Sequence, residues 1–347
     1  MNIAVAMSGG VDSSVVAAIL QEAGHQVFGV TMRHFNSYAY GFSAEDSLEK
    51  SIEDARQVCN KLGIQHHVVD VQDSFKKIVE ANFIKEYKNG RTPNPCTLCN
   101  PTIKWGVLLE KCKNMGAEKM ATGHYTKLHE KAGEYHIFRA EDRAKDQGYM
   151  LWQLSQKQLA QTLFPLAELQ KKQVRKIAEK LGIPVHTKKD SQEVCFIPGH
   201  YEDYLQKHIK FTPGDIVLPD GKVIGRHSGL PLYTVGQRKG LNTPWSSALY
   251  VQRLDVENNR LVVTDDPDDL FQEKFEIGQI NWLSKKPQSQ GITVQIRYNS
   301  NPKKVFELKL EDSSALVRLE KPARAITPGQ SAVFYKENEL LGGGIIK

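Results

Sequence analysis

The sequence contains no long apolar run and few cysteines, and each scarcity excludes a class of protein. No apolar stretch approaches the roughly 18 residues that a membrane-spanning helix needs. The chain starts without the pattern of a signal peptide, and its five cysteines are an odd number. We therefore expect a cytoplasmic protein with reduced thiols available for chemistry, rather than a membrane protein or a secreted disulfide framework.

A second absence concerns the way in which the chain would hold a nucleotide. An apolar strand over residues 3–7 runs into Ser8-Gly9-Gly10-Val11-Asp12-Ser13-Ser14 and then a helix over residues 15–20. Such a turn presents backbone N–H groups to a phosphate. No G-x-x-x-x-G-K-[ST] sequence occurs, so this is not the usual kinase or ATPase loop. A pyrophosphate loop without that lysine suits transfer of AMP with release of pyrophosphate; the alternative is an ordinary serine-capped turn.

The composition is that of a globular protein with a modest positive charge. At 347 residues, with 40% hydrophobic residues and a net charge of +6, the chain is large enough for two or three domains and admits a polyanionic partner. Residues 171–189 contain seven lysines and arginines against one acid, with apolar residues at helical spacing. This pattern predicts a basic amphipathic helix suited to a phosphate backbone, although a solvated helix face explains it equally well.

The first half of the chain alternates strands with helices. Strands are expected at residues 26–32, 65–71 and 119–123, and helices at 46–62, 75–87 and 103–115. This order predicts an α/β fold with a doubly wound parallel sheet that binds ligands at the carboxyl ends of its strands. Met32 and Gly123 lie at two such ends and are expected beside the nucleotide, although core packing is an equal alternative for Met32.

The second half is rich in short strands and turns. Closely spaced turn signals from residue 211 predict a small β-rich domain, and alternating segments between residues 280 and 347 predict an antiparallel β-barrel or sandwich. We expect domains at residues 1–208, 209–275 and 276–347.

The cysteines separate into two kinds. Cys59 and Cys112 lie in helical patterns and are expected in the core. Cys96 and Cys99 lie between residues 90 and 101, where three prolines and two asparagines lead us to expect no regular structure, and Cys195 lies in a second loop. A Cys-x-x-Cys pair alone is compatible with a redox pair or with an iron–sulfur site completed by Cys195; zinc lacks further ligands at a suitable spacing.

Several motifs in a fixed order carry a resemblance to a known family. They are G-R-T-P-N-P-x-x-x-C-N at 90–100, A-T-G-H-Y at 121–125, K-D-Q at 145–147, D-S-Q-E-V-C-F-I at 190–197 and T-V-G-Q-R-K-G-L at 234–241. With S-G-G-V-D-S-S, which resembles the pyrophosphatase-loop superfamily, they make the chain similar over nearly its whole length to the bacterial tRNA-specific 2-thiouridylases. That resemblance implies an adenine-nucleotide α-hydrolase-like domain, a central β-rich domain that contacts tRNA, and a C-terminal β-barrel.

The same resemblance implies a reaction. A tRNA-uridine 2-sulfurtransferase adenylates the uracil O2 of the wobble uridine in tRNAs for Lys, Glu and Gln, and persulfide sulfur then displaces AMP. By resemblance, Cys195 carries the persulfide and Cys99 attacks it, which leaves a Cys99–Cys195 disulfide for a reductant to reset. The resemblance also implies ATP with Mg²⁺, a cysteine desulfurase or relay protein as sulfur donor, and a monomer that binds one tRNA.

Binding residues carry over from the motifs. Those implied for ATP are Ala6, Met7, Ser8, Gly9, Gly10, Val11, Asp12, Ser13, Met32 and Gly123. Those implied for the target base and the tRNA are Asn94, Pro95, Cys96, His124, Lys145, Asp146, Gln147, Arg297, Tyr298 and Gln330. From the residues alone, Arg297 and Tyr298 would be an ordinary pair on a strand surface.

One residue departs from the family pattern. Many members carry Asp where this chain has Cys96, so any role of that carboxylate is in doubt here. Cys96 would either take the disulfide partner's place in some states or hold an iron–sulfur cluster with Cys99 and Cys195. With only three candidate ligands we expect the cluster-free persulfide route. Two other classes remain open: a ligase for a small acid, which would not need the Cys99–Cys195 pair, and a non-catalytic RNA-binding module, which would not need the loop at residues 8–14.

Overall fold

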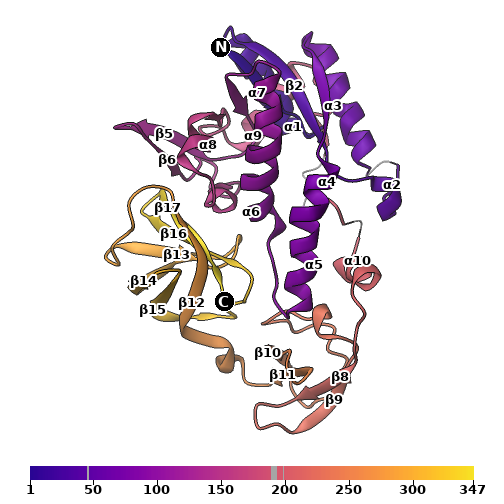
Figure 1. Ribbon diagram of the computed structural model, residues 1–347, viewed down its shortest axis with the longest axis vertical. Coiled ribbons are helices and arrows are strands. Elements are labelled where there is room, and N and C mark those ends of the chain that lie inside the picture. The colour runs from indigo at the N-terminus through magenta and orange to yellow at the C-terminus, as the bar shows by residue number, and fades with distance from the viewer. Residues whose placement is uncertain (45–46, 189–193, 198) are drawn as a thin grey trace.

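Apolar strands alternating with helices build a parallel sheet in the N-terminal part of the chain (Figure 1). The computed structural model describes residues 1–44, 47–188, 194–197 and 199–347. The strands lie in the order β3-β2-β1-β4-β7 and every pair is parallel. Their bounds are β1 Asn2–Ala6, β2 Gln26–Arg33, β3 His66–Asp70, β4 Lys119–Ala121 and β7 Thr162–Leu163.

The side chains of β1 alternate between two cores, which places helices on both faces of the sheet. Ile3 and Val5 pack with α1 (Val11–Glu22), α3 (Leu48–Leu62) and α9 (Lys171–Lys180), whereas Ala4 packs into the core on the other face. The predicted doubly wound α/β fold is therefore confirmed. Cys59 and Cys112 are fully buried in these two cores, as expected.

A long helical column covers the second face and carries the Cys-x-x-Cys pair. It comprises α6 (Pro95–Cys99), the π-helical η2 (Asn100–Leu108) and α7 (Leu109–Asn114). The expectation that residues 90–101 hold no regular structure is wrong. Asn94 is an N-cap whose side-chain oxygen accepts from the Cys96 N–H, and Pro95 occupies the first helical turn, where a missing N–H costs nothing.

The remaining helices of this part complete the covering layers. They are α2 Ser37–Tyr40, α4 Gln72–Phe75, η1 Lys76–Glu80, α5 Ala81–Lys88, η3 Gly148–Leu151 and α8 Gln156–Ala160. A hairpin of β5 (Lys127–Lys131) and β6 (Glu134–Phe138) projects from this part toward the C-terminal strands (Figure 1).

The central part follows α10 (Tyr201–His208) and has its own apolar core around Ile216, Val251 and Leu261. Its sheet has the order β10-β11-β8-β9. The elements are β8 Gly214–Val217, β9 Val223–His227, η4 Leu230–Leu232, β10 Tyr250–Asp255, β11 Arg260–Thr264 and η5 Pro267–Leu270.

The C-terminal strands, all within residues 271–346, close into a six-stranded barrel, because β12 pairs with both β15 and β17. The strands are β12 Phe271–Trp282, β13 Ile292–Gln295, β14 Lys303–Leu310, β15 Ser314–Arg324, β16 Ser331–Lys336 and β17 Glu339–Ile346. The predicted barrel is confirmed, and the expected boundary between residues 275 and 276 lies inside β12. Across the described residues, no helix has the length and apolarity to cross a membrane.

Candidate ATP loop and thiol site

The loop between β1 and α1 leaves backbone donors open to an anion. Among the described residues no side chain caps α1, whose N-cap is Gly10. The Ser8 N–H donates to Ser13 Oγ at 3.2 Å, which holds the turn together. Gly9 has a φ of +68°, and a Cβ there would lie 2.3 Å from the Ser51 carbonyl oxygen, so only glycine lets the loop pack on α3. The loop fits a phosphate chain.

Gly123 lies directly against this loop. A Cβ on Gly123 would come 3.0 Å from Asp12 Cβ and 3.1 Å from the Ser13 nitrogen. Met32 lies near the carboxyl end of β2, the strand that pairs with β1. These positions put both residues at the strand ends where the sequence predicted a nucleotide.

Two lysines that sequence reasoning did not assign to the loop reach it from distant parts of the chain. Lys171 Nζ, on α9, lies 2.7 Å from both carboxylate oxygens of Asp12, and the Tyr125 hydroxyl donates to the same carboxylate at 2.8 Å. Lys188 Nζ donates to the Gly9 carbonyl at 3.2 Å and pairs with Asp54 at 2.7 Å. The loop lacks the lysine of a kinase loop in sequence, but folding brings Lys171 to the start of α1.

The basic amphipathic helix predicted within residues 171–189 is confirmed over Lys171–Lys180 as α9, but its charges do not form one solvated face. Lys171 faces the loop, and Arg175 donates to the carbonyls of His186 and Lys188 at 3.0 and 3.1 Å. Lys172, Lys176 and Lys180 are exposed. Lys189 lies outside the described residues.

The three thiols of interest come from two segments and influence one another. All five cysteines are described, and each is free. Burial raises the pKa of Cys99 to about 11, and burial followed by the charges of Cys96 and Cys99 raises the pKa of Cys195. Cys96 and Cys195 keep solvent-accessible surface, whereas Cys99 is only 8% exposed. A reagent can therefore reach Cys195, although protein crowds the thiol enough to disfavour its thiolate. Residues 190–193 of the Cys195 motif lie outside the described part.

Lys104 is the common cation of this site, and sequence reasoning missed it. It follows Cys99 on the wide-turned η2, and its charge lowers the pKa of Cys96, Cys99 and Cys195 against the larger effect of burial. Burial first and Lys104 second lower the pKa of His124. A π-helical segment often marks a functional site, and this one could have been suspected from Pro101 inside a helical pattern.

His34 lies just after the carboxyl end of β2 and is influenced by the charge of Lys104, the lysine near the thiols. It lies two residues beyond Met32, and its Nε2 has no hydrogen-bond partner among the described residues. Burial lowers the pKa of His34 to about 4, with a smaller contribution from Lys104. A neutral imidazole beside the predicted nucleotide contact can accept a hydrogen bond from a ligand.

Some residues predicted to contact tRNA lie near the junction with the barrel, where Arg139 bonds to both Asp146 and Gln295 of β13, whereas others lie inside the N-terminal part. Asp146 accepts from the Ala140 N–H at 2.9 Å and from Arg139 at 3.2 Å, and burial raises its pKa. Gln147 accepts from the Tyr125 N–H at 3.2 Å. Lys145 is partly exposed, and His124 packs its ring 5.4 Å from the Trp105 ring.

Arg297 and Tyr298 do not form a strand-surface pair, because β13 ends at Gln295 and the two residues lie in the following turn. Arg297 donates to the carbonyls of Val235 and Ala325 at 3.1 and 2.9 Å. Burial and then the charges of Asp146 and Cys96 raise the pKa of Tyr298, which places its ring near the thiol segment.

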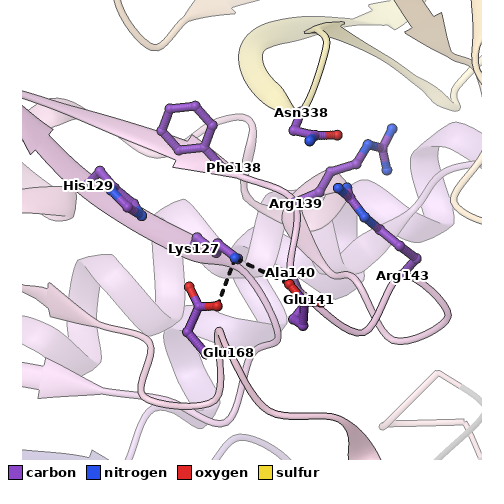
Figure 2. Close-up of a pocket in the computed structure, with 9 residues that line it drawn as sticks. All are labelled: Lys127, His129, Phe138, Arg139, Ala140, Glu141, Arg143, Glu168 and Asn338. Carbon is purple, nitrogen blue, oxygen red and sulfur yellow. Dashed lines mark hydrogen bonds and ion pairs between the residues drawn. The ribbon is translucent and has the colours of Figure 1, made fainter.

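A cavity lies away from the thiols, beside the β5–β6 hairpin. Figure 2 shows its polar lining, with Lys127 pointing to Glu168 and Glu141 at 2.9 and 3.5 Å. Its volume is about 350 Å³, and Asn338 reaches it from the barrel. The two glutamates pair with Lys127, and Arg139 and Arg143 also line the cavity.

Comparison with known proteins assigns the chain. Family models described as a tRNA methyl transferase HUP domain, a tRNA methyl transferase PRC-barrel domain and an aminomethyltransferase beta-barrel domain match residues 1–199, 202–265 and 272–346. The tRNA-specific 2-thiouridylase MnmA of Trichlorobacter lovleyi is 45% identical over 350 residues, covering 99% of this chain and 97% of the relative. The chain belongs to the tRNA-specific 2-thiouridylase family.

Other relatives support the same family. The tRNA-specific 2-thiouridylase MnmA of Clostridium acetobutylicum is 40% identical over 354 residues, covering 99% of both chains. A solved 4-thiouridine synthetase–RNA complex with bound ATP covers 59% of this chain and 50% of that chain at 16% identity and a TM-score of 0.37. This distant likeness adds nothing to the family assignment.

Proposed function

We propose that this chain catalyses the ATP-dependent 2-thiolation of the wobble uridine in tRNAs for Lys, Glu and Gln. Its membership of the tRNA-specific 2-thiouridylase family supports the tRNA and the sulfur chemistry. The observation that carries the proposal is electrostatic: the charge of Cys99 raises the pKa of Cys195, and the charge of Lys104 lowers the pKa of both, although the two cysteines are far apart in sequence.

ATP binds at the loop after β1. The open N–H groups at the start of α1 hold its phosphates, Lys171 supplies the cation that the loop sequence lacks, and Lys188 fixes the loop by its bond to the Gly9 carbonyl. Mg²⁺ would accompany the nucleotide and neutralise phosphate charge, and the Asp12 carboxylate, which also accepts from Lys171 and Tyr125, would be an oxygen ligand for it. Attack of the uracil O2 on the α-phosphate then gives an adenylated base and pyrophosphate.

The thiols deliver sulfur to the activated base. A cysteine desulfurase or a relay protein loads Cys195 with a persulfide. The Cys99 sulfur attacks the inner sulfur of that persulfide, which forms a Cys99–Cys195 disulfide and releases hydrosulfide. Hydrosulfide adds at C2 and AMP leaves, giving 2-thiouridine; a reductant then restores both thiols. Lys104 favours the anionic sulfur at each step.

The route proposed for the sulfur needs no iron–sulfur cluster, because Cys96, Cys99 and Cys195 are only three candidate ligands. The domain boundaries proposed for this activity are residues 1–208, 209–275 and 276–347, and the enzyme would act as a cytoplasmic monomer on one tRNA.

The test is mass spectrometry of nucleosides from unmodified tRNA incubated with protein, Mg-ATP and a persulfide donor. Wild type should form 2-thiouridine with equal amounts of AMP and pyrophosphate. Cys195→Ser and Cys99→Ser should form none, whereas Cys112→Ala, which removes a buried thiol elsewhere, should keep the activity. Product formed by Cys195→Ser would contradict the persulfide route, and no product from wild type would contradict the proposed reaction.

A further inference from the structure

Thr92, just before the Cys-x-x-Cys helix, is the point where all three parts of the chain meet. Its N–H donates to the Pro328 carbonyl and its own carbonyl accepts from Gln330 Nε2, both at 2.8 Å. Its hydroxyl lies 3.1 Å from the hydroxyl of Thr234 in the central part. The turn between β15 and β16, called the barrel turn below, thus binds both backbone groups of Thr92, and Thr234 of the central part binds its side chain.

The barrel turn is shaped for this contact. Gly329 has a φ of +91°, and a Cβ there would lie 2.9 to 3.0 Å from the Thr92 backbone. The neighbouring Arg91 donates to the carbonyl of Ile346 at 2.9 Å and pairs with Glu86 at 2.7 Å. The close approach therefore needs glycine in the turn and is reinforced by a second bond to the last strand of the barrel.

A stiff connection transmits the position of Thr92 to the thiol. Pro93 and Pro95 fix two of the backbone angles between Thr92 and the start of α6, and the intervening Asn94 caps that helix through its side chain. Cys99 is the last residue of α6. Few backbone bonds between Thr92 and α6 can rotate, so a displacement of Thr92 also displaces the helix that carries Cys99.

The residues assigned to tRNA by resemblance take part in this junction. Gln330 bonds to Thr92 itself, and Arg297 ties the turn to the central part through the carbonyls of Ala325 and Val235. The Gln330 amide therefore has a structural partner in the segment that leads to Cys99, in addition to any contact with tRNA.

We infer that Gln330 is a positioning residue for Cys99: through the Thr92 carbonyl it fixes the segment that sets the place of the reactive thiol. The inference rests on the proposed function only in taking Cys99 as the sulfur-transferring residue. It predicts an effect in protein that holds no tRNA, ATP or sulfur donor, which a pure tRNA contact cannot produce.

The test measures the rate at which iodoacetamide modifies each cysteine of the free full-length protein, resolved by peptide mass spectrometry. Because Cys99 is 8% exposed, its reaction requires local opening. Loss of one hydrogen bond in Gln330→Ala should raise the Cys99 rate about fivefold. Gln330→Glu keeps the size but loses the donor, so it should do the same, whereas Gln272→Ala, at an exposed glutamine on β12, should match wild type.

Each outcome decides the inference. Cys59 and Cys112 are fully buried in the two cores and report global unfolding. A faster Cys99 with silent Cys59 and Cys112 supports positioning. An unchanged Cys99 rate in both Gln330 variants overturns it, and so does a rise at Cys112 of the same size, because the effect would then be global. A failure of thiolation itself leaves these rates untouched, so the two proposals are judged separately.

Discussion

Replacing Lys171 with methionine removes a cation that contacts the Asp12 carboxylate while keeping the length and the apolar stem of the side chain. Lys171 is 12% exposed and lies 2.7 Å from Asp12 Oδ2, so the pair is largely shielded from water. At an effective dielectric constant of about 20, the attraction of two charges at this distance is about 6 kcal/mol. Desolvation of both charges offsets most of it, and we expect the free energy of unfolding to fall by about 1–2 kcal/mol.

The larger effect should be on the nucleotide. A charge-assisted hydrogen bond to a phosphate contributes about 1.5–3 kcal/mol, which corresponds to a rise of about 10- to 100-fold in the Kd for ATP. Calorimetric titration of a non-hydrolysable ATP analogue into tRNA-free protein measures this directly. Lys172→Met, at the exposed neighbouring position, removes the same charge from α9 and should leave the Kd within about twofold of wild type. Equal Kd values for Lys171→Met and wild type would refute the assignment of Lys171 to the phosphates.

Three further predictions concern the loop and the thiol helix. Gly9→Ala should lower the free energy of unfolding, measured in urea, by about 2 kcal/mol more than Gly24→Ala. Both glycines have a positive φ, but of the two only Gly9 has the Ser51 carbonyl within reach of an added Cβ. Equal losses would show that α3 moves aside to accept the Cβ. Lys104→Gln removes a charge that lowers the pKa of Cys99. The alkylation rate of Cys99 at pH 9 should therefore drop about threefold or more, and the pH dependence of that rate should move to higher pH. An unchanged pH dependence would contradict the electrostatic role of Lys104. Asn94→Ala should cost about 1 kcal/mol of stability through the lost N-cap, and a value near zero in the same urea experiment would argue against that cap.

Local patterns in the sequence were enough for the sheet and the loop. The apolar run in residues 3–7 and the turn after it predict β1 and the start of α1 within a few residues, because both depend on neighbours in sequence. The barrel strands were equally visible from residue 292 onward, since each alternates on its own. The sequence pattern does not predict β12 as one strand, because its first four residues, beginning with Phe271, are all exposed and show no alternation in burial.

Contacts between distant segments could not be predicted in the same way. Lys171 meets Asp12 across 159 residues, and Gln330 meets Thr92 across 238, so no window of sequence contains either pair. The helix at Pro95 escapes the sequence pattern for another reason: three prolines within residues 90–101 indicate a loop, although Asn followed by Pro is a common helix start. Which of the predicted tRNA-binding residues touch tRNA stays a prediction.

The strand pairing between β6 and β17 restricts how this protein could be recombined with its relatives. Glu339 and Leu340 of β17 pair with Phe138 and Ile137 of β6. A hairpin from the first half of the sequence is therefore hydrogen-bonded to the last strand of the barrel. His136 Nδ1 lies 2.7 Å from the Glu339 carboxylate at the same seam. A chimera that inherited its barrel from another species would have to inherit this hairpin as well, and natural variation at the two sites should therefore be coordinated rather than independent.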